Sequence, residues 1–212
     1  MNAKKLPNQE ADTAQKLIEV AIELFSTAGF TGTSIRDIAK VTGMSISNIY
    51  YYFGNKDGLL LAILEHSSRD LVDSLSNVAE LEMEPLERFK LLVRTHLQLV
   101  KLHKREAKIF FLDEDHLTTE GFKVNKKFQL DILNIYRHEI EILKEKGYIN
   151  YQHLTVLAFN ILGVVNWHLR WYRPSGPLSL DELTEEIMIF ILKGVLNDPA
   201  SVAGPISTIA EE

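Results

Sequence analysis

The sequence predicts an all-α protein. Apolar residues recur at helical spacing along most of the chain, and no segment alternates apolar and polar residues as a half-buried strand does. Glycine, proline and capping residues divide this pattern into about nine segments of helical length. With 212 residues, 46% of them apolar, the chain can bury a sizeable core without disulfides or metals.

The first helix is predicted from about Thr13 to Ala28, with Gly29 as its C-cap. Thr33 or Ser34 begins a short second helix, which ends at Gly43. Each of these segments has one apolar face. The sequence therefore predicts a small helical cluster at the N-terminus, with one further short helix after Gly43.

That third helix is predicted from the capping residue Ser45 to about Phe53. Ile49 and Phe53, four residues apart, form its core pair. With these two residues facing the core, Ser47, Asn48 and Tyr51 are expected to point outward. Tyr50 and Tyr52 are expected to point outward only in part.

The rest of the chain predicts longer helices. Asn55 caps a fourth helix that continues through Leu75 and looks like a connector. Pro85 suits the first turn of the next helix, and Gly147 suits the end of a later one. Ser179 and Glu182 have capping-box spacing at the start of the last helix. The expected ranges are 84–104, 105–113, 120–146, 154–172 and 179–196.

Composition removes several classes of protein. The absence of cysteine excludes disulfide frameworks, thiolate zinc sites and cysteine nucleophiles. No apolar run approaches the roughly 20 residues of a membrane span, and the start of the chain lacks the apolar centre of a signal peptide. We therefore expect a soluble cytoplasmic protein. The net charge is −6, but residues 1–58 carry six basic and six acidic side chains, so this part is neutral.

No catalytic or metal-binding pattern is evident. The chain has no phosphate-binding loop, nucleophile elbow or paired-carboxylate signature in a supporting context. Its seven histidines form no pair at ligand spacing. We expect no enzyme activity, no bound metal and no cofactor.

The second and third helices have the spacing of a helix-turn-helix, with Gly43 in the turn between them. Spacing alone leaves two interpretations open, because an ordinary helical corner has the same geometry. The residues themselves resemble the TetR/AcrR regulators. The resemblance covers residues 13–65 and rests on Ala28-Gly29-Phe30, 33–39, Gly43-Met44-Ser45, 49–53 and 55–60.

The resemblance implies a DNA-binding domain whose third helix enters the major groove. Residues at the starts of the second and fourth helices are expected to position phosphates, namely Thr33, Ser34 and Lys56. Readers of the base edges and backbone are expected on the third helix, and Asn48 suits adenine. The full set expected to contact DNA is Thr33, Ser34, Ser45, Ile46, Ser47, Asn48, Tyr50, Tyr51, Tyr52 and Lys56.

Two features qualify this interpretation. Tyr52 suits a partly buried position as well as it suits a DNA contact. The family pattern often has a basic residue and a glycine where this chain has Ile46 and Ser47, which puts one phosphate contact in doubt. The assignment to the family does not depend on that contact.

We expect three regions: a DNA-binding domain at 1–58, a ligand-binding and dimerisation domain at 59–198, and a disordered tail at 199–212. Aromatic and apolar side chains on the long helices suit an apolar effector pocket. The expected ligand-binding residues are Phe89, His96, Phe110, Phe128, Trp167 and Arg170. The phenylalanines equally suit a plain core, and His96 suits a hydrogen-bonded core position.

Residues 167–179 are similar to a stretch in TetR-family regulators of fatty-acid and sterol degradation that sense acyl-coenzyme A. That similarity implies a long-chain acyl-coenzyme A as effector, with its anionic part near Arg or Lys. Alternatively, the stretch only ends the penultimate helix and shapes the dimer. An aromatic or xenobiotic effector is the other candidate.

The family resemblance also implies a homodimer, in which the last two helices of each subunit form a four-helix bundle. The expected contributors are Phe159, Gly163, Ile187, Phe190 and Ile191. Together these features predict a transcriptional repressor that leaves its operator DNA when a small apolar effector binds. A helical adaptor that does not bind DNA is the competing interpretation.

Overall fold

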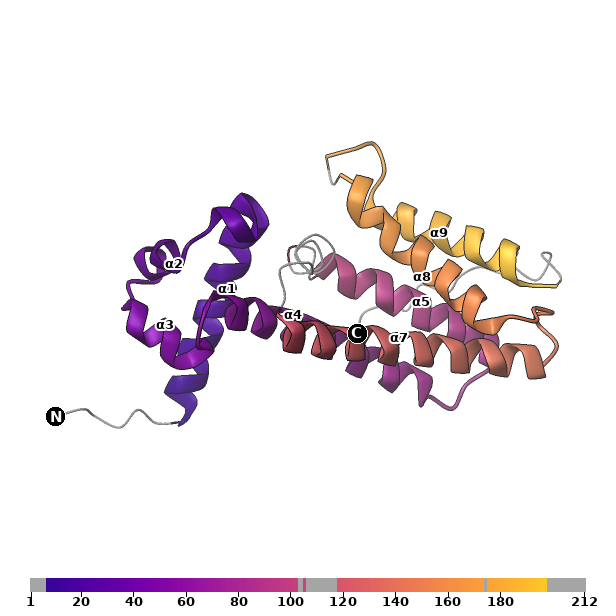
Figure 1. The fold of residues 1–212 in the computed structure, drawn as a ribbon. Coiled ribbons are helices and arrows are strands. Elements are labelled where there is room, and N and C mark those ends of the chain that lie inside the picture. The colour runs from indigo at the N-terminus through magenta and orange to yellow at the C-terminus, as the bar shows by residue number, and fades with distance from the viewer. Residues whose placement is uncertain (1–6, 103–104, 106–117, 174, 198–212) are drawn as a thin grey trace. The chain divides into compact units, whose positions relative to one another are not determined.

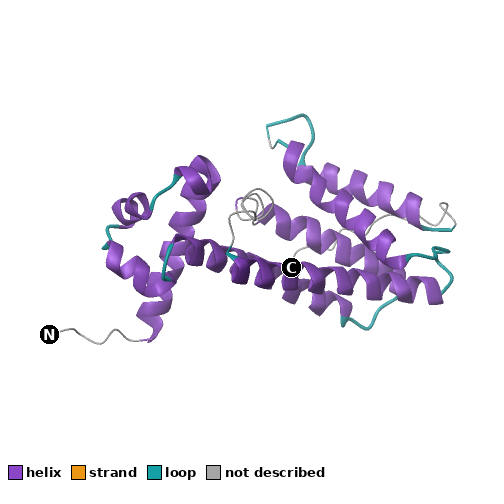
Figure 2. Cartoon of the chain, in the orientation of Figure 1, coloured by secondary structure: helices purple, strands orange, loops and turns teal. Residues whose placement is uncertain are grey.

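The computed structural model describes residues 7–102, 105, 118–173 and 175–197, and it contains eight helices in that part of the chain (Figure 1). Figure 2 draws every described residue as helix or as loop, and none as strand. The predicted all-α fold is therefore confirmed. The helix expected at 105–113, except for residue 105, and the tail at 199–212 lie outside the described residues.

The first helix, α1 (Pro7–Gly32), starts six residues earlier than the sequence predicted. Pro7 is compatible with a first helical turn because no backbone N–H is needed there. The predicted end at Gly29 is present as a kink, where the backbone leaves helical geometry with φ 77° and ψ 162°. A side chain rarely adopts that positive φ, which explains glycine at this position.

Two short capped helices follow, α2 (Ile35–Thr42) and α3 (Ile46–Phe53). Ser34 caps α2 and Ser45 caps α3, each by accepting a hydrogen bond from the backbone N–H three residues later. Gly43 ends α2 in the left-handed conformation, with φ 70°. The predicted turn between the two helices is therefore confirmed in its boundaries and its caps.

The connector helix, α4 (Lys56–Ala79), begins against the end of α3. The Asn55 side chain accepts a hydrogen bond of 2.7 Å from the Gly58 backbone N–H, as expected of a cap. A Cβ atom on Gly58 would lie 2.0 Å from the Phe53 carbonyl oxygen. The α3–α4 corner therefore closes so tightly that only glycine fits at this position.

The N-terminal helices share one apolar core, and α4 contributes to it. Fully buried Leu17 and Phe25 come from α1, and Ile38 and Ile49 come from α2 and α3. The side chains of this core cluster are Leu17, Ala21, Ile22, Phe25, Phe30, Ile35, Ile38, Ile49, Leu59, Leu60, Ile63 and Leu64. Because α3 is held by Ile49, its opposite face is left for solvent or a partner.

Four further helices make up the rest of the described chain: α5 (Pro85–Leu102), α7 (Thr119–Glu145), α8 (Leu154–Trp171) and α9 (Leu180–Val195). After α7, Gly147 adopts a positive φ of 78°. Ser179 and Glu182 form the predicted capping box at the start of α9. These boundaries agree with the sequence prediction to within a few residues.

The chain divides into two compact units. One comprises residues 1–73 and 99–131, and the other comprises residues 74–98 and 132–212. Helices α4, α5 and α7 each contribute residues to both units. Within the second unit, ion pairs join α5 to its neighbours, Arg88 to Glu139 of α7 at 2.9 Å and Arg94 to Glu185 of α9 at 2.8 Å.

Every helix in the described residues is too short or too polar to span a lipid bilayer. In the same residues, no three histidine, aspartate or glutamate side chains come together in a way that could hold a metal ion.

Candidate nucleic-acid interface

One face of α3 is the most open polar and aromatic surface of the N-terminal helices. Ile49 is completely buried and anchors the helix, whereas the residues around it from Ser45 to Asn48 are exposed. Tyr51 is 74% exposed, more than any other large apolar or aromatic side chain that the structure describes. The predicted outward placement of Ser47, Asn48 and Tyr51 is therefore present.

The start of α3 is prepared for a polar or anionic partner. The Ser45 hydroxyl oxygen accepts a hydrogen bond of 3.1 Å from the Asn48 backbone N–H, and no acidic residue lies in the first turn. The N-terminus of a helix carries a partial positive charge. A phosphate or an electronegative groove can therefore approach this end of α3 without opposing a carboxylate.

The three consecutive tyrosines differ in their surroundings. Tyr50 is 48% exposed and Tyr51 more so, while Tyr52 is half-buried and packs against the N-terminal core. The rings of Tyr51 and Tyr52 meet edge to face, with centroids 5.2 Å apart. Tyr52 therefore supports Tyr51 from the core side, and the partly buried position considered for Tyr52 is the one observed.

The expected phosphate positioners at the start of α2 are already engaged within the chain. Thr33 is 4% exposed, and its hydroxyl donates to the carbonyl oxygens of Gly29 and Leu24, at 3.0 and 3.3 Å. The Ser34 hydroxyl and backbone N–H both donate to the Asp37 carboxylate, at 2.6 and 2.8 Å. These donors stabilise the α1–α2 turn, and the structure offers no support for giving them to phosphate.

Asp37 is the residue that takes the anion position at this helix start. The hydrogen bonds from Ser34, first from its side chain and then from its backbone, hold the pKa of Asp37 below its ordinary value of 3.8. A carboxylate near a helix N-terminus is stabilised by the helix dipole. The chain therefore supplies its own anion at the start of α2 but not at the start of α3.

Lys56 likewise makes an internal contact. Its ammonium group donates to the Phe30 carbonyl oxygen and lies 4.0 Å from the centroid of the Phe30 ring. This contact fastens the beginning of α4 to the end of α1. The expected phosphate contact by Lys56 remains a prediction, and the position of the ammonium is set by α1.

Two exposed cations of the same motif were not among the residues predicted to contact DNA. Arg36 and Lys40 lie four residues apart on α2, and both side chains are exposed. Their charge and their spacing on one helix face were visible in the sequence. They add two candidate phosphate contacts to the exposed face of α3.

The residues expected to bind a small ligand do not gather at one described cavity. Phe89 and His96 of α5 are buried in the core, and Phe128 of α7 is half-buried. Trp167 is 61% exposed, and the Arg170 guanidinium lies 5.6 Å from its ring centroid. Phe110 lies outside the described residues.

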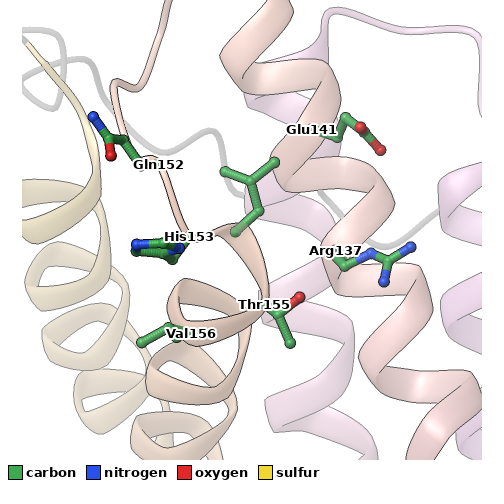
Figure 3. Close-up of a pocket in the computed structure, with 7 residues that line it drawn as sticks. Arg137, Glu141, Gln152, His153, Thr155 and Val156 are labelled. Carbon is green, nitrogen blue, oxygen red and sulfur yellow. The ribbon is translucent and has the colours of Figure 1, made fainter.

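A polar hollow of about 390 Å³ lies between α7 and the start of α8, and none of the expected ligand-binding residues lines it. Figure 3 shows Arg137 and Glu141 on α7, with Gln152 and His153 before α8. Thr155 and Val156 complete the labelled lining, and every labelled side chain is exposed. Such a shallow polar surface does not suit a long apolar effector.

The expected dimer residues divide into two groups. Phe159 is 58% exposed and Phe190 is 66% exposed, and Gly163 is exposed as well. Ile187 and Ile191 are only 8% and 3% exposed because they face the core of their own chain. The expected partner contact of these two isoleucines stays a prediction, and in the single chain α9 turns its opposite face outward.

Known proteins resemble most of the chain. The transcriptional repressor KstR2 of Mycobacterium tuberculosis is 27% identical over 199 residues, which cover 86% of this chain and 92% of that protein. A TetR/AcrR-family regulator from Thermobifida fusca is 29% identical and superposes with a TM-score of 0.73, covering 86% of this chain and 98% of its own.

A second similar structure is that of AibR, solved in complex with isovaleryl coenzyme A and operator DNA. It is 26% identical, with a TM-score of 0.74, and the match covers 86% of this chain and 97% of AibR.

Two family models match the chain in sequence. The model "Bacterial regulatory proteins, tetR family" matches residues 17–63, which include α2, α3 and the beginning of α4. The model "Tetracyclin repressor-like, C-terminal domain" matches residues 82–195, more than half of the chain. The chain belongs to the TetR family of bacterial regulatory proteins.

Proposed function

We propose that this protein is a homodimeric transcriptional repressor that binds operator DNA through α3 and leaves it when a long-chain acyl-coenzyme A binds. The observation that carries the proposal is the exposed face of α3, with Ser47, Asn48 and Tyr51 directed away from the core. A capped turn and a buried Ile49 hold this face in place. Residues 1–58 form the DNA-binding domain in this proposal.

Each part of the face has a chemical task. The Asn48 amide can pair with adenine through one acceptor and one donor. Tyr50 and Tyr51 offer hydroxyl groups to phosphates and ring faces to thymine methyl groups. Ser45 to Ser47 lie at the helix start, where they would face the DNA backbone. Arg36 and Lys40 add positive charge, which strengthens binding to any DNA without selecting a sequence.

The dimer proposal rests on an exposed apolar stripe along α8. Val156, Phe159 and Gly163 follow one another at intervals of three or four residues and are all exposed. Phe190 of α9 is exposed in the same way. A face of this kind, on two helices that contact each other, suits the isologous contact of a twofold dimer. Two copies would present two α3 helices to successive major grooves.

The effector proposal rests on the C-terminal part of the chain. Residues 59–198 would form the ligand-binding and dimerisation domain. The AibR structure contains isovaleryl coenzyme A, so at least one similar protein takes an acyl-coenzyme A thioester, here with a short branched acyl group. Trp167 and Arg170 lie in contact on the exposed side of α8, where they could hold the anionic coenzyme portion.

Release requires that the effector bind the DNA-free conformation more tightly than the DNA-bound one. A coupling free energy of about 1 to 3 kcal/mol would lower operator affinity several-fold or more. The connector α4 contributes residues to both units and is the covalent route for such coupling.

The test is binding of the purified protein to the DNA upstream of its own gene, measured by fluorescence anisotropy with and without palmitoyl-coenzyme A. Tight binding relieved by the thioester supports the repressor and its effector. Binding that the thioester leaves unchanged keeps the repressor and favours an aromatic or xenobiotic effector. If the protein binds neither this DNA nor any neighbouring promoter, the adaptor interpretation is favoured.

A further inference from the structure

A polar strip crosses the buried contact between α5 and α7. We call it the α5–α7 seam and define it by the polar residues Arg88, His96, Tyr136 and Glu139, together with the apolar Phe89 next to Arg88 in the chain. Phe89, Tyr136 and Glu139 are fully buried, and His96 is 1% exposed. Buried polar groups are costly unless each is hydrogen-bonded. A polar atom of the seam that lacks a hydrogen-bond partner is therefore a candidate contact for a bound molecule.

One end of the seam satisfies itself. The Nδ1 atom of His96 and the Tyr136 hydroxyl share a hydrogen bond of 2.9 Å. Burial, together with the nearby His168, lowers the pKa of His96 to about 3, and burial raises the pKa of Tyr136. Both side chains are therefore neutral at physiological pH. The pair adds polarity to the seam without adding charge.

The other end leaves one atom unused. The Glu139 Oε2 atom accepts a hydrogen bond of 2.9 Å from Nε of Arg88, whose side chain is only 12% exposed. The second oxygen, Oε1, is buried and has no hydrogen-bond partner among the residues that the structure describes. A buried carboxylate oxygen with no such partner can accept a hydrogen bond from a bound molecule.

We propose that the α5–α7 seam binds the effector through Glu139 Oε1 and that the group bound there is a neutral hydrogen-bond donor, a hydroxyl or an amide N–H. This inference rests on the proposed function, because it locates the polar group of the same effector. A cation would leave Arg88 uncompensated in the core, and an anion would lie beside the carboxylate. A neutral donor avoids both costs. In an acyl-coenzyme A, the pantetheine arm carries such groups.

The seam is also tied to the end of the connector helix. Arg88 donates from Nη1 to the Leu81 carbonyl oxygen at 3.2 Å, and Leu81 lies in the turn that follows α4. The Glu139–Arg88–Leu81 chain of contacts therefore joins the site to this turn. A ligand that parts α5 from α7 must disturb Arg88, which gives the site a route to the connector.

The experiment compares two compounds that differ only in a hydrogen-bond donor, and two double variants that each remove one ion pair. The compounds are 1-dodecanol, which has a donor, and 1-methoxydodecane, which does not, with palmitoyl-coenzyme A as third probe. The proteins are wild type, the double variant Arg88→Met/Glu139→Met and the control Arg94→Met/Glu185→Met, which removes a different ion pair of α5. Replacing both members of a buried pair usually preserves folding. Circular dichroism melting checks this for each variant.

We expect wild type to bind dodecanol about 10-fold to 100-fold more tightly than its methyl ether in calorimetric titrations, as for a hydrogen bond to a charged acceptor. This preference and the affinity for palmitoyl-coenzyme A should both fall at least about tenfold in Arg88→Met/Glu139→Met and stay unchanged in the control. Glu139→Gln retains an acceptor oxygen and should recover part of the preference.

The outcomes separate this inference from the proposed function. If wild type binds dodecanol no more tightly than its methyl ether, or if the preference survives in Arg88→Met/Glu139→Met, Glu139 does not bind the effector. The seam assignment is then overturned. If palmitoyl-coenzyme A releases DNA from both double variants alike, the repressor stands and the seam falls. If the preference is found but the thioester does not release DNA, the seam stands and the thioester effector is rejected.

Discussion

The Lys56 ammonium group lies 4.0 Å from the centroid of the Phe30 ring and donates a hydrogen bond to the Phe30 carbonyl oxygen. One side chain thereby satisfies the end of α1 and fixes the first turn of α4. It joins two helices through residues that are 26 positions apart in sequence. The orientation of α3, which lies between them in the chain, depends on this contact.

Lys56→Met should lower the free energy of unfolding by about 1 to 2 kcal/mol, because it removes a cation–π contact and a charge-assisted hydrogen bond. Urea unfolding followed by circular dichroism measures the change. Lys16→Met, at an exposed position on α1, is the matched control and should have little effect. Equal stability of the two variants would show that the Lys56 contact does not hold α4.

Gly58→Ala should destabilise the protein by about 1 to 3 kcal/mol, since the new Cβ would lie 2.0 Å from the Phe53 carbonyl oxygen and force the α3–α4 corner apart. Gly194→Ala is the control, because nothing lies within 4 Å of its Cβ position. Alanine favours a helix over glycine, so the control should be neutral or slightly stabilising. Thermal unfolding of both variants decides the matter, and a neutral Gly58→Ala would contradict the close approach.

Asn48→Ala should weaken binding to the operator by about 1 to 3 kcal/mol while leaving binding to unrelated DNA almost unchanged, because the amide reads a base and not the backbone. Fluorescence anisotropy with operator and scrambled duplexes measures both affinities. Asn134→Ala, at an exposed site on α7, serves as control. A uniform loss on both duplexes would instead assign Asn48 to the phosphates.

The Ser179–Glu182 cap should make stability depend on pH. Hydrogen bonds from the Ser179 side chain and backbone hold the pKa of Glu182 below its ordinary value of 4.5. Because the folded-state pKa is lowered, this contribution is complete above pH 4.5 and is lost as the pH falls through the lowered value. Glu182→Gln should therefore be less stable than wild type at neutral pH, and the difference should shrink in acid.

Urea unfolding at a series of pH values tests this cap. Glu186→Gln makes the same substitution at an exposed position of the same helix. It provides the comparison and should show no such trend. A stability difference for Glu182→Gln that stays constant from neutral to acid pH would rule out the charged cap.

Phe190→Glu should shift the protein from dimer to monomer, because it places a charge in the proposed contact where the side chain is now 66% exposed in the single chain. Analytical ultracentrifugation measures the shift. Leu130→Glu, at a 46% exposed position on α7, is the control and should leave the dimer intact. If Phe190→Glu remains dimeric, the interface lies on another face.

The sequence was sufficient for the helix boundaries because the terminating signals are local. Ser34, Ser45 and Ser179 cap the helices that they were expected to cap, and Gly43 adopts the predicted left-handed conformation. Ile49 faces the core as its spacing required. Family membership then confirms the expectation of a regulatory protein and not an enzyme.

Two expectations could not take account of contacts that side chains make within their own chain. On α9, Phe190 and Ile191 are adjacent and apolar, and only packing reveals that Ile191 belongs to its own core. At the start of α2, Ser34 looked available for phosphate, yet Asp37 three residues later takes both of its donors. Spacing identifies polar groups, but it does not show which partner wins them.

Helix α4 has no glycine or proline after Gly58, so its remaining 21 residues lack the usual points of bending. At a rise of 1.5 Å per residue, a helix of 24 residues is about 36 Å long. Because α4 lacks those points of bending, we expect a regulatory movement to be taken up mainly near its two ends. Substitutions near Lys56 or Leu81 should thus retune the response, whereas those in between should mainly alter stability.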